Sequence, residues 1–338
     1  MSTTTVPPAT RKSMPLWRIG LMALIVASLI AMPLLKDNID WVTNSRLFSF
    51  TQMFMLIALA SNWNLTGGFT GYVDFGHAVF FGIGAYGTGV LMHDGWEFPV
   101  ALIAGAIFAA IYALIVGYPT LRLKGPYFSI AMLGTFVAVR EIVRVWKGVT
   151  GGGVGLTLPP YLNREAFYYY TLGFALFVVA IMWWIRRSEF GGSLIAIRED
   201  EIGAEMRGIN TTRQKMTAFI VAGFLSGVVG GMWAYQNTFI DPDIVFIESR
   251  TIELVMMTML GGLGTVLGPV VGAASIYWMR DVVWANFLDY HLIVEGALLI
   301  IIVLFVPRGI MGIFGDRSGT SLTELWSGWL GKKKADDQ

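Results

Sequence analysis

A succession of long apolar runs separated by short polar stretches is the feature that most constrains this chain. The runs 98–118, 166–185 and 214–236 each approach the ~20 apolar residues that a helix needs to cross a bilayer. Of the 338 residues, 55% are hydrophobic and only 14% are charged, which excludes an ordinary soluble domain. Because a helix satisfies its own backbone groups in lipid, the pattern predicts an all-α polytopic membrane protein.

The composition also excludes several functions. A net charge of +1 gives no indication of a nucleic-acid partner. The chain has no cysteine for a disulfide or a thiolate metal site, and its three histidines, His77, His93 and His291, are far apart. We therefore expect no cofactor and no metal. A membrane-embedded enzyme would lack a credible catalytic cluster.

The long polar loop 186–215 sets the predicted orientation. Lys and Arg beside membrane spans stay on the cytoplasmic side. Counting crossings from a cytoplasmic N-terminus also brings the start of this loop to the cytoplasm, and we expect the C-terminus to be cytoplasmic as well. The basic residues of the loop are Arg186, Arg187, Arg198, Arg207, Arg213 and Lys215.

The domain organisation follows from this reading. Residues 1–15 are predicted to be a disordered cytoplasmic N-terminus, 16–313 the transmembrane region, and 314–338 a cytoplasmic tail. Within the tail, 322–330 has Leu and Trp at helical spacing. This predicts a short amphipathic helix lying in the interface of the inner leaflet against membrane lipids. The alternative is a helix that packs against the bundle.

Two apolar stretches are interrupted by glycine. Thr66–Gly71 opens the first, and Leu260–Pro269 divides the run 252–278. A cytoplasmic C-terminus needs an even number of crossings, so we expect 252–278 to enter and leave on the same side as two half-helices. The prediction is about eight transmembrane helices plus one re-entrant or broken helix. Paired interruptions of this kind are the best sequence indication of a transport site.

Polar residues gather at these interruptions. Asp74 and His77 are three residues apart and share one face if the stretch is helical. Ionisable residues at membrane depth are functional hypotheses by default. Asp74 either lines the pathway or caps a half-helix, whose N-terminal amides favour an anion. The candidate substrate pathway comprises Asn62, Asn64, Gly68, Asp74, Gly76, His77, Gly262 and Gly264.

Two further glycine patterns predict packing. Gly82–Gly87 matches the dinucleotide fingerprint, but it follows no strand and lies inside an apolar span, so close helix packing explains it better. The small residues Gly223, Gly227 and Gly231 are spaced four apart, which lets transmembrane helices approach closely.

The polar loop is expected to contain one short helix, Ser193–Arg207, with Gly208 as its left-handed stop. Thr211 and Gln214 would form a capping box for the next helix. Glu201 and Glu205 are four apart, so both project from one face, and such a pair would fit a basic groove on a soluble partner. An ordinary solvated loop is the alternative.

Five stretches of the sequence carry recognisable motifs: 71–86 (GYVDFGHAVFFGIGAY), 123–134 (LKGPYFSIAMLG), 150–156 (TGGGVGL), 191–209 (GGSLIAIREDEIGAEMRGI) and 260–273 (LGGLGTVLGPVVGA). They resemble the permeases of the branched-chain amino-acid ABC importer family, of the LivM-like kind. The resemblance implies a multi-pass permease subunit of the bacterial inner membrane, with no enzymatic activity of its own. It also implies four kinds of contact: a second homologous permease, two ATP-binding cassette subunits that hydrolyse ATP, an extracytoplasmic solute-binding protein, and lipid.

The same resemblance implies a coupling helix in the polar loop and a range of solutes. Family members often read S-L-G-H where this chain has 74–77 (DFGH), and related permeases serve urea, amides or aromatic acids as well as branched-chain amino acids. An ion-coupled secondary transporter using Asp74 or Glu295 is the alternative function. The residues to which the resemblance assigns ATPase coupling are Arg198, Glu199, Asp200, Glu201, Glu205 and Gly208.

Overall fold

The computed structural model describes residues 16–36, 42–160, 163–286, 293, 297 and 309–311. The predicted N-terminus 1–15, Glu295 and the tail 314–338 with its amphipathic helix lie outside the described residues. Within the described part the chain is almost entirely helical. It is an all-α polytopic membrane protein, as the apolar runs predict.

The α-helices follow the predicted spans closely. Three of them, α4, α7 and α10, are long and apolar enough to cross a membrane, and α1 and α3 contain shorter apolar stretches. The described α-helices are α1 (Leu16–Ala31), α2 (Asn44–Asn64), α3 (Ala78–His93), α4 (Phe98–Thr120), α5 (Pro126–Val145), α6 (Lys147–Thr150), α7 (Arg164–Arg187), α8 (Glu189–Glu199), α9 (Glu201–Met206), α10 (Thr211–Asn237), α11 (Pro242–Val245), α12 (Ser249–Gly261) and α13 (Gly268–Asn286).

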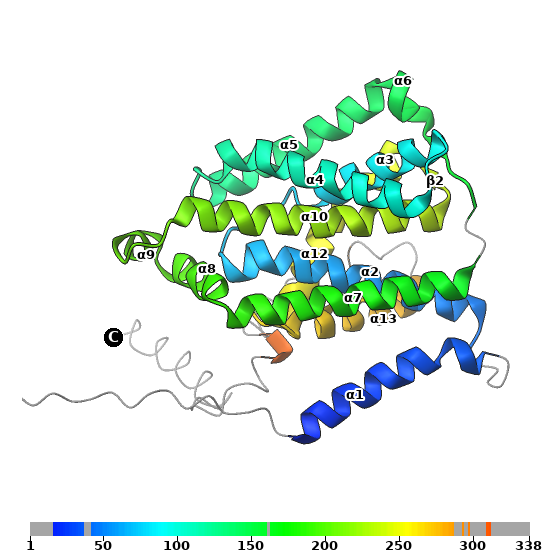
Figure 1. Cartoon of the computed structure of the whole chain (residues 1–338), viewed down its shortest axis with the longest axis horizontal. Coiled ribbons are helices and arrows are strands. Elements are labelled where there is room, and N and C mark those ends of the chain that lie inside the picture. The colour runs from blue at the N-terminus through cyan, green and yellow to red at the C-terminus, as the bar shows by residue number, and fades with distance from the viewer. Residues whose placement is uncertain are drawn as a thin grey trace, which may run out of the picture.

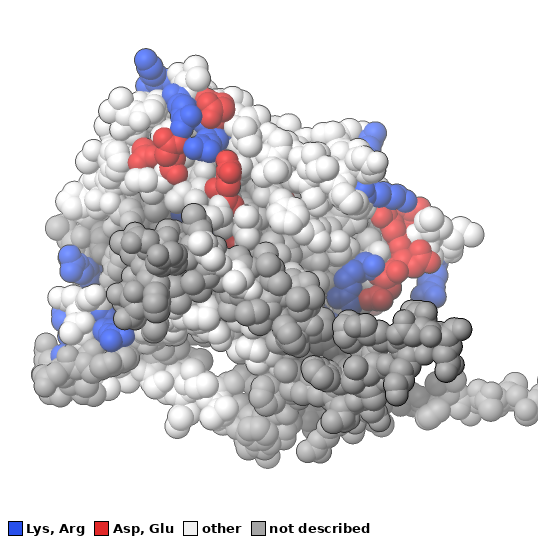
Figure 2. All heavy atoms as spheres, turned by 180° about the vertical axis from the view of Figure 1, so that it is seen from behind, with Lys and Arg blue, Asp and Glu red and all other residues white. Residues whose placement is uncertain are grey.

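The long helices run side by side, with α10 at the centre. Figure 1 shows α3, α4 and α5 on one side of α10, and α2, α7 and α13 on the other. The short helices α8 and α9 lie at one end of the bundle (the α8–α9 end). At the opposite end α6 lies near a two-residue antiparallel pair, β1 (Leu156–Thr157) with β2 (Phe239–Ile240) (the β1–β2 end). Figure 2 shows charged side chains gathered near these two ends, with uncharged surface between them where described atoms are visible.

Glycines hold α3, α4 and α10 together. A Cβ on Gly84 of α3 would collide with the backbone of Gly227 on α10, and a Cβ on Gly227 would lie 3.0 Å from Cα of Ala106 on α4. A Cβ on Gly87 of α3 would likewise lie 2.9 Å from Cα of Gly105 on α4. These contacts confirm that both glycine patterns serve close helix packing.

Both predicted interruptions are present, although the first differs in detail. The α2 helix passes into a π-helix, η2 (Leu65–Phe69), and α3 begins only at Ala78, several residues after the predicted glycine-rich opening Thr66–Gly71. Gly71 has φ +77°, a left-handed conformation that ends the helical path. The run 252–278 is divided as predicted into α12 and α13, which are separated by the break 262–267.

The polar loop differs from its prediction in two ways. The single helix Ser193–Arg207 is wrong, because Asp200 is extended (φ −158°, ψ 105°) and separates α8 from α9. The capping box at Thr211 is also wrong. Asn210 caps α10 instead, its Oδ1 accepting from the amide of Arg213 at 3.0 Å. Gly208 does adopt the left-handed conformation, with φ +84°.

Candidate functional site

The two interrupted segments meet inside the bundle. The side chain of Asn64, the last residue of α2, makes two hydrogen bonds to the break between α12 and α13. Its Oδ1 accepts from the amide of Gly264 at 2.9 Å, and its Nδ2 donates to the carbonyl oxygen of Thr265 at 2.8 Å. Residues some 200 positions apart in the chain are thereby held together. The structure places Asn64 and Gly264 of the predicted pathway at one junction.

Gly68 completes this junction. A Cβ on Gly68 would lie 2.7 Å from the amide nitrogen of Gly264, so the two backbones can approach only because neither residue has a side chain there. The guanidinium of Arg198, at the end of α8, donates from Nη1 to the carbonyl oxygen of Gly68 at 2.9 Å. Arg198 also lies against Gly264, where an added Cβ would be 2.5 Å from Nη1. The polar loop therefore touches both interruptions through one side chain.

Asp74 and His77 form a buried chain of polar contacts with Ser226 of α10. Nδ1 of His77 lies 3.1 Å from Oδ2 of Asp74, and its Nε2 lies 2.9 Å from Oγ of Ser226. The side chains of Asp74 and His77 are fully buried, and so is Ser226. Ser226 was not among the predicted site residues, because no local pattern links it to a histidine 149 positions away.

Asp74 does not cap α3. Its Oδ1 accepts from the amide of Gly76 at 2.9 Å, within the loop that precedes the helix, and the indole of Trp63 donates to its carbonyl oxygen at 2.9 Å. The first amide of α3, that of Ala78, is bound by Thr251 Oγ1 at 3.2 Å. Asp74 thus holds the loop 70–77 in place and is shielded from any solute in this conformation.

The remaining predicted pathway residues are spread around this junction. Asn62 is fully buried, and neither Oδ1 nor Nδ2 of its amide has a hydrogen-bond partner in the part of the chain that the structure describes. An unpartnered buried amide is costly, so it marks a position where a polar ligand or water would be stabilised. Gly76 packs against the backbone of Met132, and Gly262 ends α12 with φ 127°.

An ion pair between the buried Lys215 and the half-buried Glu201 fastens α9 to the bundle. Nζ of Lys215 donates to Oε1 of Glu201 at 2.6 Å and to the carbonyl oxygen of Leu121 at 3.0 Å. The hydroxyl of Tyr72 donates to Oε2 of Glu201 at 2.8 Å. Burial alone raises the pKa of Glu201, but these hydrogen bonds and the positive charges of Lys215 and Lys124 lower it more, so the net pKa lies below the ordinary range.

The two glutamates of the predicted pair differ in exposure: Glu201 is half-buried against the bundle, whereas Glu205 is exposed. Glu201 faces the bundle, and Oε1 of Glu205 accepts from the hydroxyl of Thr211 at 2.6 Å. The outward side of α9 carries Ile202 and Met206 instead, whose side chains are 64% and 86% exposed. This apolar pair was not predicted from the sequence, although its i, i+4 spacing indicates that both side chains share one helix face.

The remaining coupling candidates lie at the same end of the bundle. Glu199 pairs with Arg198, with Nη2 to Oε1 at 2.6 Å, and Asp200 is exposed at the break between α8 and α9. The left-handed Gly208 ends the α9 segment, where the amide of Ile209 donates to the carbonyl oxygen of Ala204 at 3.1 Å. Among the described residues, no group of three or more His, Asp or Glu could hold a metal ion.

Apolar helices with two interrupted segments that meet in the interior, and a polar loop docked on their junction, define a membrane permease. The sequence profile of the family described as "Branched-chain amino acid transport system / permease component" matches residues 45–303, and the chain belongs to this family. It is a multi-pass inner-membrane protein, the permease subunit of an ABC importer for small solutes. This favours the importer over the ion-coupled alternative.

Relatives with established names fit this assignment. The high-affinity branched-chain amino acid transport system permease protein LivM of Salmonella typhimurium strain LT2 is 26% identical over 329 residues, covering 87% of this chain and 75% of LivM. LivM of Escherichia coli K12 gives the same values. The autoinducer 2 import system permease protein LsrC of Salmonella paratyphi B is 27% identical over 274 residues, covering 76% of this chain and 77% of LsrC. No solved structure matches significantly.

Proposed function

We propose that this permease carries a branched-chain amino acid, or a small polar solute related to it, into the cytoplasm. The names of the LivM relatives support the amino-acid class, and those of the LsrC relatives show that similar permeases serve other small molecules. Two ATP-binding subunits would hydrolyse ATP, a second homologous permease would complete the pathway, and an external binding protein would deliver the solute.

In this proposal the α8–α9 end faces the cytoplasm, as do both termini. The basic residues of loop 186–215 support that orientation. The opposite end carries an ion-pair network in which Arg140 binds Asp243 at 2.8 Å and Glu248 at 3.2 Å, and Arg144 also binds Asp243. This network fixes the loop around α11 and offers a polar surface of both signs to the solute-binding protein.

The observation that carries the proposal is the two-sided character of α9. Its inner side is fastened to the bundle by Glu201 and Lys215, while Ile202 and Met206 stand exposed on its outer side. Two large apolar side chains facing water favour a surface that a partner covers. We therefore assign the docking of the ATP-binding subunit to the outer side of α9.

The contact of Arg198 with Gly68 supplies the route for coupling. A displacement of α8 would move the carbonyl oxygen of Gly68, and with it the junction that Asn64 and Gly264 form. ATP-driven closure at α9 would in this way reach the interrupted segments directly.

The test replaces Ile202 and Met206 together by Asp, with Val154→Asp as the matched control, because Val154 is 83% exposed at the opposite end of the bundle. We expect the double variant to insert in the membrane at normal levels but to lose the ATP-binding subunits during purification, and uptake to stop. The Val154→Asp control should retain both the ATP-binding subunits and normal uptake. Retention of the subunits with normal uptake in the double variant would refute the docking assignment.

A further inference from the structure

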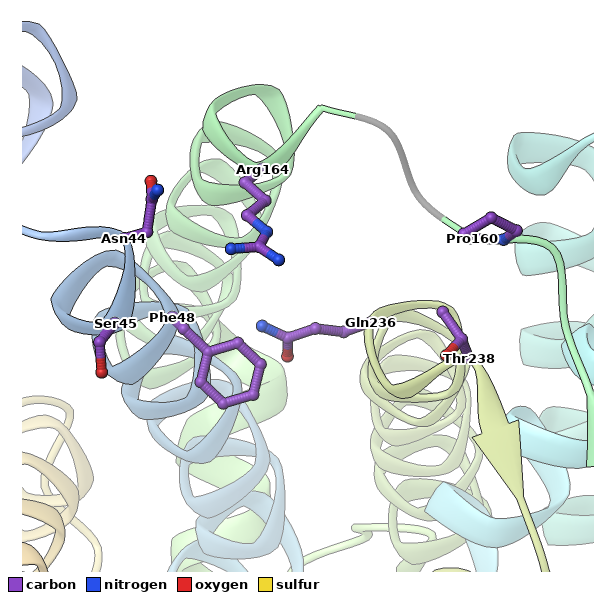
Figure 3. A pocket seen from close by; sticks show the side chains of 7 residues that line it. All are labelled: Asn44, Ser45, Phe48, Pro160, Arg164, Gln236 and Thr238. Carbon is purple, nitrogen blue, oxygen red and sulfur yellow. The ribbon is translucent and has the colours of Figure 1, made fainter.

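A cavity opens at the β1–β2 end of the bundle, away from the junction described above. Its volume is about 520 Å³, within the ~300–1,000 Å³ range of small-molecule sites. Figure 3 shows it between the N-terminal ends of α2 and α7 and the C-terminal end of α10. Its lining residues are Asn44, Ser45, Phe48, Pro160, Arg164, Gln236 and Thr238.

One wall of this cavity is positively charged. Arg164 is the first residue of α7, and in Figure 3 its guanidinium points into the space between α2 and α10. It forms no ion pair within the described residues, whereas the neighbouring Glu165 is neutralised by Lys36 at 3.2 Å. Asn44 and Ser45 begin α2, so the unpaired amides of a second helix N-terminus add partial positive charge. This wall suits a carboxylate.

The opposite wall presents an acceptor. Gln236 is buried at the end of α10, its side chain points into the cavity in Figure 3, and its Oε1 has no hydrogen-bond partner in the described structure. The C-terminal end of a helix also carries partial negative charge. An ammonium group placed here would satisfy the buried oxygen.

Two further features suit an apolar amino acid. The ring of Phe48 lines the cavity and is 43% exposed, so it offers apolar surface to a hydrophobic side chain. Thr238, also in the lining, has φ +57°, a left-handed conformation that is strained for a β-branched residue. Such strain is found where a particular geometry is held for a ligand.

We propose that this cavity is a reception site for a zwitterionic α-amino acid at the outer mouth of the permease. Arg164 binds the carboxylate, Oε1 of Gln236 accepts from the ammonium group, and Phe48 packs against the side chain. The inference rests on the proposed import of an amino acid and adds the residues that would receive it before translocation.

The experiment uses the complete complex in lipid nanodiscs, with its ATP-binding subunits and without the solute-binding protein, titrated with radiolabelled L-leucine. We expect Arg164→Gln to weaken binding about tenfold or more, and Gln236→Leu to weaken it several-fold, because each removes a charge-assisted hydrogen bond. Lys147→Gln removes an exposed cation at the same end, outside the cavity, and should bind leucine as the unchanged complex does. Co-purification of the subunits verifies that each variant is assembled.

Two analogues of leucine test the two walls of the cavity separately. Isocaproate lacks the ammonium group, so its weaker binding should remain sensitive to Arg164→Gln and become insensitive to Gln236→Leu. Isoamylamine lacks the carboxylate and should show the reverse. Equal binding of leucine by the Arg164→Gln and unchanged complexes would overturn the proposal.

Other outcomes distinguish this site from the proposed function. If the complex imports leucine from its binding protein but retains none in the nanodisc titration, the site is refuted and the function stands. If it imports no amino acid at all, the solute class is refuted as well. If Arg164→Gln lowers only the affinity for the solute-binding protein, the cavity is a docking surface and the reception site is wrong.

Discussion

The guanidinium of Arg198 donates a 2.9 Å hydrogen bond to the carbonyl oxygen of Gly68, a residue 130 positions earlier in the chain. Gly68 lies in the π-helical turn η2, which ends α2. π-helical turns occur frequently at functional sites because their backbone geometry departs from the regular ladder. In this permease the turn supplies an acceptor that the polar loop holds.

Replacing Arg198 therefore tests the coupling route. Arg198→Gln removes the charge and the planar donor fork, and we expect uptake to fall severalfold or more while the ATP-binding subunits remain bound, because the docking side of α9 is intact. Arg207→Gln, an exposed change on the same loop, is the control and should leave uptake unchanged. Solute uptake and ATP hydrolysis measured on the same vesicles check this. Equal uptake in both variants would remove Arg198 from the route.

The pair of Lys215 and Glu201 should dominate the stability of the loop. Lys215→Met leaves the carboxylate of Glu201, which is 17% exposed, without its cation. Breaking a fully buried pair costs roughly 3–5 kcal/mol, and solvent screening at Glu201 should make the loss smaller than that. Adding Glu201→Gln to Lys215→Met removes the stranded charge and should restore part of the loss. Thermal unfolding in detergent measures both. A double variant no more stable than Lys215→Met alone would contradict an electrostatic origin.

The same pair predicts a pH dependence. The folded-state pKa of Glu201 lies below its value in an unfolded chain, about 4.3. The contribution of this ion pair to the stability of the loop is therefore complete above the unfolded-state pKa. It is lost as pH falls through the lower folded-state pKa. Protease accessibility of loop 186–215 should stay constant from neutral pH to about 5 and increase below about 4. Glu201→Gln should weaken this acid-induced step. An identical step in that variant would assign it to another group.

Asp74 is expected to hold the loop before α3 through its two oxygens. Asp74→Ala leaves the buried amide of Gly76 and the ring of His77 without acceptors, which costs about 1–3 kcal/mol for each orphaned group. Asp74→Asn keeps an oxygen for Gly76 and should assemble normally, while the lost charge disturbs the contact with His77 and lowers transport. Asp94→Ala, at an exposed carboxylate, is the control. Normal uptake kinetics in Asp74→Asn would limit the residue to a structural role.

The sequence predicts the spans well because apolar length is a local property. Both interruptions follow from glycine and proline, and the left-handed Gly208 follows from its place after a helical stretch. The division of α8 from α9 could not be predicted from the sequence. The extended Asp200 directs the next residue, Glu201, inward to Lys215. That contact joins two segments through tertiary packing, which a local pattern does not contain.

The sequence predicted which residues form the site better than it predicted the contacts among them. Asn64, Gly68 and Gly264 were all candidates, and the structure brings them together through hydrogen bonds between distant segments. Arg198 was assigned to the partner interface, yet it also faces the junction. The link from His77 to Ser226 and the cavity at Arg164 depend on which helices are neighbours, and periodicity does not determine that.

The glycine contacts among α3, α4 and α10 also restrict how this chain can change shape. Where backbones touch, there is no intervening layer of side chains that can change rotamer and let one helix slide past another. The three helices should then travel as one rigid body. Alternating access would have to be generated around that body, with the non-helical loop 70–77 as a natural hinge. In such a motion α3, α4 and α10 would keep their mutual arrangement while the other helices of the permease rotate relative to them.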